Sequence, residues 1–289
     1  LTKVGVSSNS RNGSKTNEWA LMTSRIGWED LVWGDPDGGK IILHGTIPTV
    51  VYPRKLRPSM EWHGLGLLES EEVVELWEQE EKDESESSGV NLAHGLVSGG
   101  TMGILLEELT QIDDINAGRF PDPEPRRVHR LAQRHNRPVF FIEPELDDES
   151  WEEHMIAEAK EVSRWKKLLG MVTVGKKWRK RVKSNIFEAE KPPKGVTPNL
   201  SSAAVLCATW WDLNEWLIGE KISQDRNLRF ASRLRGALSE LRKKHGDDAV
   251  LLVPIFLPWR SAMYNQLVKL PNVEENSSNK TSTVNMEEE

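Results

Sequence analysis

The chain has 289 residues, of which 29% are charged, and a formal net charge of -7. This length allows one large domain or two small ones. The acidic balance disfavours a general nucleic-acid binder but leaves room for a local basic patch. No run of about eighteen apolar residues could span a bilayer, and a single cysteine, Cys207, excludes an intramolecular disulfide. Because low cysteine content is typical of a reducing compartment, we predict a cytoplasmic location.

The N-terminal quarter predicts an arm, a hairpin and an irregular connection, in that order. Residues 1–17 are rich in Ser, Asn, Gly and Lys, which predicts a flexible arm. The turn sequence Asp35–Gly39 separates two β-prone runs, Leu31–Trp33 and Lys40–His44, and this pattern predicts a β-hairpin. Three prolines within 48–58 then predict a connection without regular structure.

The next part of the chain predicts helices around one short strand. Glu69–Glu86 reads as an acidic amphipathic helix that gives way to a loop at its end. Ser98–Thr101 resembles the capped start of a helix that continues to Leu109, and a further helix is expected over Arg126–His135. The apolar run Val139–Ile142 is typical of a buried strand.

The C-terminal half predicts mostly helix, with Lys191–Pro198 as a linker and Ala249–Val253 as a second buried strand. The expected helices are Glu149–Leu169, Lys176–Phe187, Ser201–Ile218, Ser223–His245 and Ser261–Leu270. Both apolar runs should be central strands of one sheet, because continuous apolar character suits burial on both faces. The sequence therefore predicts a helix-rich α/β fold with a small central sheet in a single domain, 18–270. A disordered polar tail is expected over 271–289.

No complete catalytic or cofactor motif is present. No pair of the seven histidines has the four-residue spacing that places two metal ligands on one helix face. Gly95–Gly99 has leucine where a nucleophile elbow needs its first glycine. Gly99–Gly103 lacks the lysine of a phosphate-binding loop. Cys207 lies in an apolar stretch, so we interpret it as a small buried hydrophobe.

The most conspicuous charge feature is residues 164–183, which we call the basic segment. It contains nine Lys and Arg residues without an intervening Asp or Glu. Such a surface could hold RNA, DNA or an anionic membrane. We favour the alternative that it pairs with the acidic Glu69–Glu86 segment. The anion-binding candidates are Lys176, Lys177, Arg179, Lys180 and Arg181.

Several segments together resemble the TraB family, which is related to the Tiki and erythromycin-esterase-like proteins. Six elements of the family have counterparts here: its first strand, its acidic segment, its helix-helix-strand unit, its basic Trp/Lys helix, its charged helix opening and its last strand. In that order they are Asp37–Thr46, Val73–Leu76, Gly103–Glu145, Ser163–Leu169, Gln224–Asn227 and Ala249–Pro258. The resemblance covers about half of the chain and implies an α/β domain.

The departures from the family pattern concern its two Gly-x-x-His motifs, the presumed metal-binding elements. Here the first reads Gly45-Thr46-Ile47-Pro48, and the second aligns with Val253-Pro254-Ile255-Phe256. Neither Pro48 nor Phe256 can replace an imidazole ligand. The resemblance therefore implies a degenerate member, for which we expect no bound metal and no cofactor.

Three functional hypotheses follow. The first is a non-catalytic binding or scaffold protein. The second is a metal-dependent hydrolase or peptidase-like enzyme with a rearranged site, whose candidate catalytic residues are His44, Glu75, Asp225 and Arg226. The third is an RNA- or membrane-surface-associated protein that uses the basic segment. A protein partner at that segment and a homo-oligomer both remain open.

Overall fold

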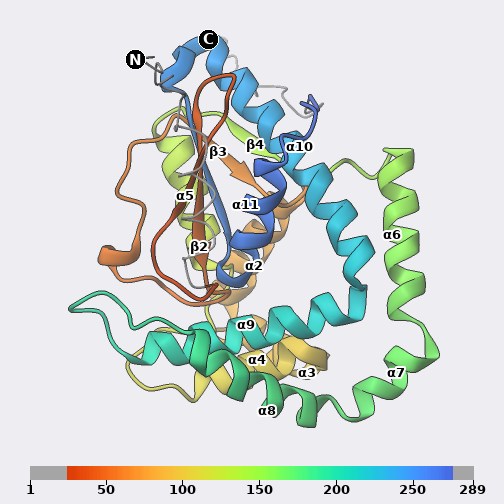
Figure 1. Cartoon of the computed structure of the whole chain (residues 1–289). Coiled ribbons are helices and arrows are strands. Elements are labelled where there is room, and N and C mark those ends of the chain that lie inside the picture. The colour runs from red at the N-terminus through yellow and green to blue at the C-terminus, as the bar shows by residue number, and fades with distance from the viewer. Residues whose placement is uncertain (1–24, 276–289) are drawn as a thin grey trace, which may run out of the picture.

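A five-stranded sheet forms the centre of the computed structural model, which describes residues 25–275 (Figure 1). The order across the sheet is β1-β2-β5-β3-β4. β1 pairs antiparallel with β2, and the other neighbouring strands run parallel. The predicted α/β fold and N-terminal hairpin are confirmed, whereas the predicted arm 1–17 lies outside the described residues. The strands are β1, Leu31–Gly34; β2, Lys40–Thr46; β3, Gly64–Leu67; β4, Val139–Phe141; and β5, Val250–Phe256.

The central strand is β5, which pairs with β2 on one side and with β3 on the other. Its side chains alternate between two apolar clusters: Leu251 and Val253 pack on one face, and Leu252 packs on the opposite face. This double burial explains the continuous apolar sequence and confirms the predicted central strand at 249–253.

The prediction that Val139–Ile142 is also central is wrong, because β4 lies at the edge of the sheet and pairs with β3. The strand between β4 and β5 is β3, whose Gly-Leu-Gly-Leu sequence carries no β-branched residue. A Cβ added at Gly64 would lie 2.8 Å from a methyl carbon of Leu241, so glycine lets the helix that carries Leu241 pack closely against this strand.

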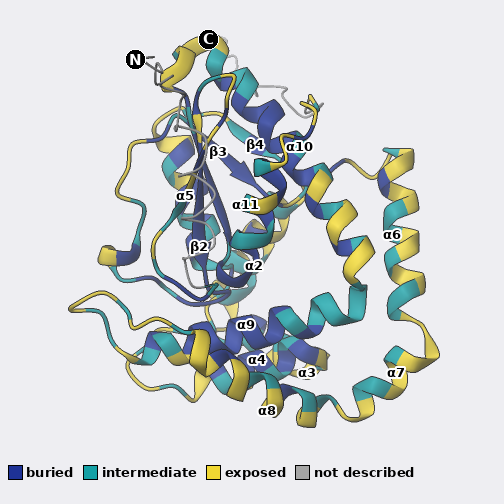
Figure 2. Cartoon of the chain, in the orientation of Figure 1, coloured by how far each residue is buried: buried dark blue, intermediate teal, exposed yellow. Residues whose placement is uncertain are grey.

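Helices cover both faces of the sheet. α10 (Glu220–His245) and α11 (Arg260–Val268) lie on one face. On the other face, Trp77 and Val128 pack against Ile42; they belong to α2 (Val73–Glu86) and α5 (Pro123–Arg134). Buried residues concentrate in the sheet and in the helices nearest to it (Figure 2).

A second group of helices lies beyond the carboxyl ends of the parallel strands (Figure 1). Its members are α3, Val90–Ser98; α4, Gly100–Thr110; α8, Val174–Asn185; and α9, Asn199–Ile218. The sequence did not predict α3, which meets α4 at Gly99 with a left-handed φ of 70°. α9 has more buried residues than the other members of this group, including the buried Cys207 that its apolar setting predicted.

The predicted continuous helix Glu149–Leu169 is also wrong, because the chain forms two helices, α6 (Glu149–Val162) and α7 (Trp165–Val172). Arg164 between them is extended, with φ -60° and ψ 135°. No Pro or Gly marks this break in the sequence. The break redirects α7 so that Lys167 donates a hydrogen bond to the carbonyl of Trp216 on α9.

A buried ion pair fixes the β1-β2 turn to α10. Arg235 donates to both carboxylate oxygens of Asp35, over 2.9 Å and 3.0 Å, and the Asp35 side chain is fully buried. Arg235 also donates to Asp37, whose side chain is 61% exposed. The turn therefore depends on a charge pair that solvent does not screen.

We expect Asp35→Ala to destabilise the protein by about 3–5 kcal/mol, because it leaves the Arg235 guanidinium buried without its main partner. Chemical denaturation followed by circular dichroism would measure the free energy of unfolding. The matched control is Asp37→Ala, which removes an exposed partner of the same arginine and should cost less than about 1 kcal/mol. Equal losses for the two variants would contradict this interpretation.

Candidate functional site

The carboxyl edge of the parallel strands is where open α/β sheets bind ligands, especially where neighbouring strands connect in different directions. Here carboxyl groups gather just beyond that edge. Glu69 follows β3, Glu143 follows β4, and Asp122 precedes α5. The backbone amide of Glu143 donates to the carbonyl of Glu69 over 3.3 Å, which holds the first two segments side by side.

A small cavity of about 70 Å³ opens at this edge. Glu69 and Asp122 line it, together with Thr46, Trp77, Phe256 and Trp259. Sites for small organic ligands usually have volumes of roughly 300–1,000 Å³, so this cavity can hold a few water molecules but not a substrate. The edge has acidic groups, but the packed aromatic side chains leave little room beside them.

Two of these carboxyl groups have a pKa well above its ordinary value. Burial raises the pKa of Asp122 to about 8, and repulsion from Glu124 and Glu69 adds to this effect. Burial also raises the pKa of Glu69 to about 7, with a contribution from Glu143. Glu69 as a whole residue is exposed to solvent, although protein surrounds its carboxyl group on most sides.

His44, the first predicted catalytic residue, lies on β2 and is buried. Its Nδ1 is 2.8 Å from Oδ1 of Asp30, which resembles the orientation of a general base by a carboxylate. Its Nε2 has no hydrogen-bond partner within residues 25–275, and its ring meets the edge of Tyr52. A general base must reach a substrate proton, and the burial of His44 closes that route in this conformation.

The other predicted catalytic residues lie elsewhere. Glu75 on α2 lines a cavity outside the β4 edge. Asp225 on α10 is exposed and pairs with Lys221 over 3.0 Å. Its neighbour Arg226 pairs with Glu215 and lies over the ring of Trp259, 4.9 Å from its centroid. Across the described residues, no hydrogen bond or ion pair joins any two of the four, so they do not form a common site.

Metal-ligating groups are similarly dispersed. In the part of the chain that the structure describes, no group of three or more His, Cys, Asp or Glu side chains could hold a metal ion. Burial raises the pKa of the Cys207 thiol, which favours its protonated form and disfavours a nucleophilic thiolate.

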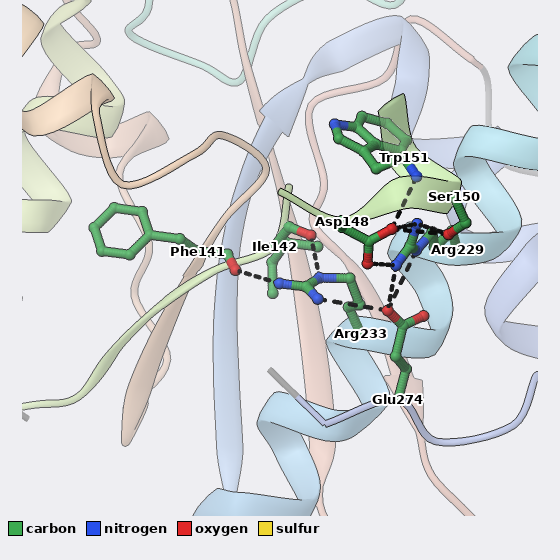
Figure 3. A network of polar contacts seen from close by, with 8 residues as sticks. All are labelled: Phe141, Ile142, Asp148, Ser150, Trp151, Arg229, Arg233 and Glu274. Atoms are coloured by element: carbon green, nitrogen blue, oxygen red, sulfur yellow. Dashed lines mark hydrogen bonds and ion pairs between the residues drawn. The ribbon is translucent and has the colours of Figure 1, made fainter. Parts of the chain in front are cut away.

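A network of hydrogen bonds and ion pairs lies at the carboxyl end of β4 (Figure 3). Arg229 on α10 donates to Asp148, the N-cap residue of α6, and to Glu274, over 2.5 Å and 3.0 Å. Arg233 donates to the carbonyl of Ile142 over 2.6 Å. The C-terminal segment that carries Glu274 crosses α10 at Gly236, where an added Cβ would lie 1.9 Å from the Glu274 carbonyl oxygen. The charged groups of this network are hydrogen-bonded to one another, so we interpret the network as structural.

The basic segment has an unusual orientation. On α7, the apolar residues lie at helical spacing and form one stripe, which in a globular protein normally faces the core. Here the stripe faces solvent: Trp165 is 70% exposed, Leu168 49%, Leu169 51% and Val172 83%. No residue of α7 is buried.

Trp216 on α9 holds α7 in this orientation. The ammonium groups of Lys167 and Lys177 lie 4.9 Å and 3.3 Å from the centroid of its ring. Gly170 lets the ring approach, because an added Cβ would lie 2.5 Å from it. The polar side of α7 therefore contacts the protein, and its apolar side is left outside.

On α8, the cations form a second exposed stripe with the same spacing, made by Lys176, Arg179, Lys180 and Lys183. None of these four forms an ion pair with any residue in 25–275. Two predicted anion-binding residues are engaged instead: Lys177 lies over Trp216, and Arg181 is 3.5 Å from Asp212. The buried Trp178 anchors the opposite side of α8.

The favoured pairing of the basic segment with Glu69–Glu86 is wrong. The acidic helix α2 pairs instead with α5, because Glu81 contacts Arg126 over 2.9 Å and Arg130 over 2.5 Å. Within the basic segment, Arg164 and Lys167 pair with Glu161 of the preceding helix. Opposite charge in the sequence does not identify the partner, because α2 packs on a face of the sheet, whereas α8 lies in the helix group beyond the carboxyl ends of the strands (Figure 1).

No protein family, curated protein or solved structure was found to match the chain. The TraB resemblance therefore stays a prediction. Within the described residues, no helix has both the length and the apolar composition needed to cross a bilayer.

We expect Asp122→Asn to stabilise the protein at pH 8 but not at pH 4. The folded-state pKa of about 8 exceeds the ordinary value of 3.8, so the carboxyl group destabilises the fold increasingly as pH rises between these values. Removing the ionisable group should therefore raise the free energy of unfolding at pH 8 by at least about 1 kcal/mol, or Tm by about 2–4 °C.

Thermal unfolding at both pH values tests this expectation. Asp225→Asn is the matched control, because Asp225 is exposed, and it should change Tm little at either pH. If Asp122→Asn stabilised the protein as much at pH 4 as at pH 8, the raised pKa of Asp122 could not be the cause of the stabilisation.

Proposed function

We propose that this chain is a non-catalytic binding protein that associates with anionic membrane surfaces through its basic segment. The observation that supports this most directly is the pair of exposed stripes, apolar on α7 and cationic on α8. Helices that lie in a membrane interface combine Trp, Phe or Leu on one side with Lys and Arg on another.

The apolar stripe supports insertion into the interface. Trp165 is suited to this position, because its ring has an apolar body and a polar N–H that prefers the headgroup region. Phe187, just beyond α8, is 90% exposed and adds a further apolar side chain near the same segment. Contact with a bilayer would remove these side chains from water.

The cationic stripe supports an anionic surface as the partner. Each Lys or Arg close to such a surface contributes about 1 kcal/mol to binding, and four cations of α8 are free to contribute. A second copy of the chain would be a poorer partner for these stripes, because self-association would bring the two cationic stripes together.

A membrane is favoured over nucleic acid for a related reason. The phosphate backbone of RNA would attract the cations of α8, but it offers no apolar phase for Leu168, Leu169 and Val172. The predicted cytoplasmic location fits this proposal, since the cytoplasmic leaflet carries anionic lipids.

The hydrolase hypothesis has weaker support. The Asp30-His44 pair favours an acid–base role, but the cavity at the carboxyl edge is small and His44 is buried. A degenerate TraB-like domain would agree with a binding role, as the missing histidines implied.

Vesicle flotation tests the proposal. We expect the protein to float with vesicles of phosphatidylcholine that contain roughly a third phosphatidylserine, and not with phosphatidylcholine alone. Lys176→Ser, Arg179→Ser and Lys180→Ser together should weaken binding about 100-fold, since three cations contribute about 3 kcal/mol. Trp165→Ser with Val172→Ser should weaken it at least about tenfold through lost apolar contact.

The matched control combines Leu146→Ser with Lys244→Ser, which removes an exposed apolar residue and an exposed cation outside the basic segment. This control should float like the original chain. RNA binding that depends on the α8 cations, without vesicle binding, would replace the membrane with nucleic acid as the partner. Failure to float with either vesicle would reject the proposal.

A further inference from the structure

A second positively charged site lies away from the basic segment, in a cavity of about 780 Å³ beside α5. The cavity is bounded by α5, the loop that precedes it and the connection after β2. Its volume is within the range of small-molecule sites. Six arginines line it: Arg57, Arg119, Arg126, Arg127, Arg130 and Arg134.

The α5 arginines are arranged as a stripe. Arg126, Arg130 and Arg134 follow one another at four-residue spacing, which places them on one side of the helix. Like charges at this spacing destabilise a helix by roughly 0.2–0.5 kcal/mol per pair. Glu81 offsets part of this repulsion, but its one carboxylate serves both Arg126 and Arg130.

The remaining positive charge is not neutralised. Arg127 pairs with Glu124 over 2.7 Å, so two carboxylates, those of Glu81 and Glu124, face six guanidinium groups, which leaves four positive charges. Within residues 25–275, Arg57, Arg119 and Arg134 form no ion pair with a carboxylate. This positive charge also affects the neighbouring His129. Burial lowers the pKa of His129 to about 4, and repulsion from Arg126 and Arg130 adds to this effect.

Two of the unpaired arginines are already oriented. Arg57 donates from Nε to the carbonyl of Tyr52 over 3.2 Å, and Arg119 donates from Nε to Oδ1 of Asn116 over 2.6 Å. Anchoring through Nε fixes the guanidinium plane and leaves the terminal N–H groups available. Such preorganised forks match the oxygen pairs of a phosphate group.

We propose that this cavity binds a small ligand that carries two or more phosphate groups. Four unneutralised charges in a concave site favour an anion of high charge density, and a chain of linked phosphates supplies several charges within a small volume. This proposal does not depend on the membrane function, because it rests on residues outside the basic segment.

Isothermal titration calorimetry with sodium tripolyphosphate, at about 0.1 M salt, tests the proposal. We expect saturable binding to the full chain and at least tenfold weaker binding by orthophosphate. Arg57→Gln with Arg119→Gln should weaken tripolyphosphate binding at least tenfold. These two arginines are chosen because their replacement breaks no ion pair with a carboxylate, and an unchanged Tm would show that the fold is retained.

The matched control is Lys176→Ser with Lys180→Ser, which removes two cations from the basic segment and should leave tripolyphosphate affinity unchanged. Vesicles that contain a multiply phosphorylated inositol lipid distinguish the source of the phosphates. Binding to them that requires Arg57 and Arg119 but not Lys176 and Lys180 would support the same chemistry, with a lipid headgroup as the ligand. The proposal would be overturned if neither tripolyphosphate nor the vesicles with phosphorylated inositol lipid bound. It would also be overturned if the two Gln substitutions left the affinity for tripolyphosphate unchanged.

Discussion

The pairing of β5 with β2 and β3 is the constraint on which the other elements depend. Ile42 pairs with Leu252, which lies 210 positions further along the chain. The sheet therefore cannot close until nearly the whole described chain is available, and the loop-closure entropy of that pairing opposes folding. Burial of β5 on both faces supplies the compensating free energy. Of the helices between β4 and β5, α10 covers a face of the sheet, whereas α8 and α9 lie beyond the carboxyl ends of the strands. This placement leaves α7 and α8 at the periphery.

Much of the fold follows from local sequence patterns, and the errors have identifiable physical causes. The hairpin and β5 were predictable because turn residues and continuous apolar runs are strong signals. β3 was missed because its glycines serve close packing by Leu241, which only the tertiary structure reveals. As a result, β4 was assigned to the centre of the sheet instead of its edge. The break before α7 has no local signal either, and the contacts of Lys167 with Trp216 are seen only in the tertiary structure.

The candidate sites were less accessible to sequence reasoning. The cations of the basic segment were visible, but an apolar stripe at helical spacing ordinarily predicts a core-facing helix. Its outward orientation in α7 depends on Gly170 and Trp216. The arginine-lined cavity could not be predicted, because Arg57 and Arg119 come from loops that meet α5 only after folding. A net charge of -7 thus coexists with two separate basic surfaces, since the acidic residues are concentrated elsewhere.

The crossing of the C-terminal segment over α10 has a practical consequence for handling the protein. Glu274 supplies a carboxylate to Arg229 and Arg233, and Gly236 leaves space for the backbone that delivers it. A purification tag fused directly after Pro271 would place foreign residues where the C-terminal segment crosses α10, and it would remove this carboxylate. Among the described residues, Arg229 would then keep Asp148 as its one carboxylate partner, beside its hydrogen bond to Ser150, and α10 would lose this link to the C-terminal segment. A tag joined beyond Glu275 would keep these contacts intact.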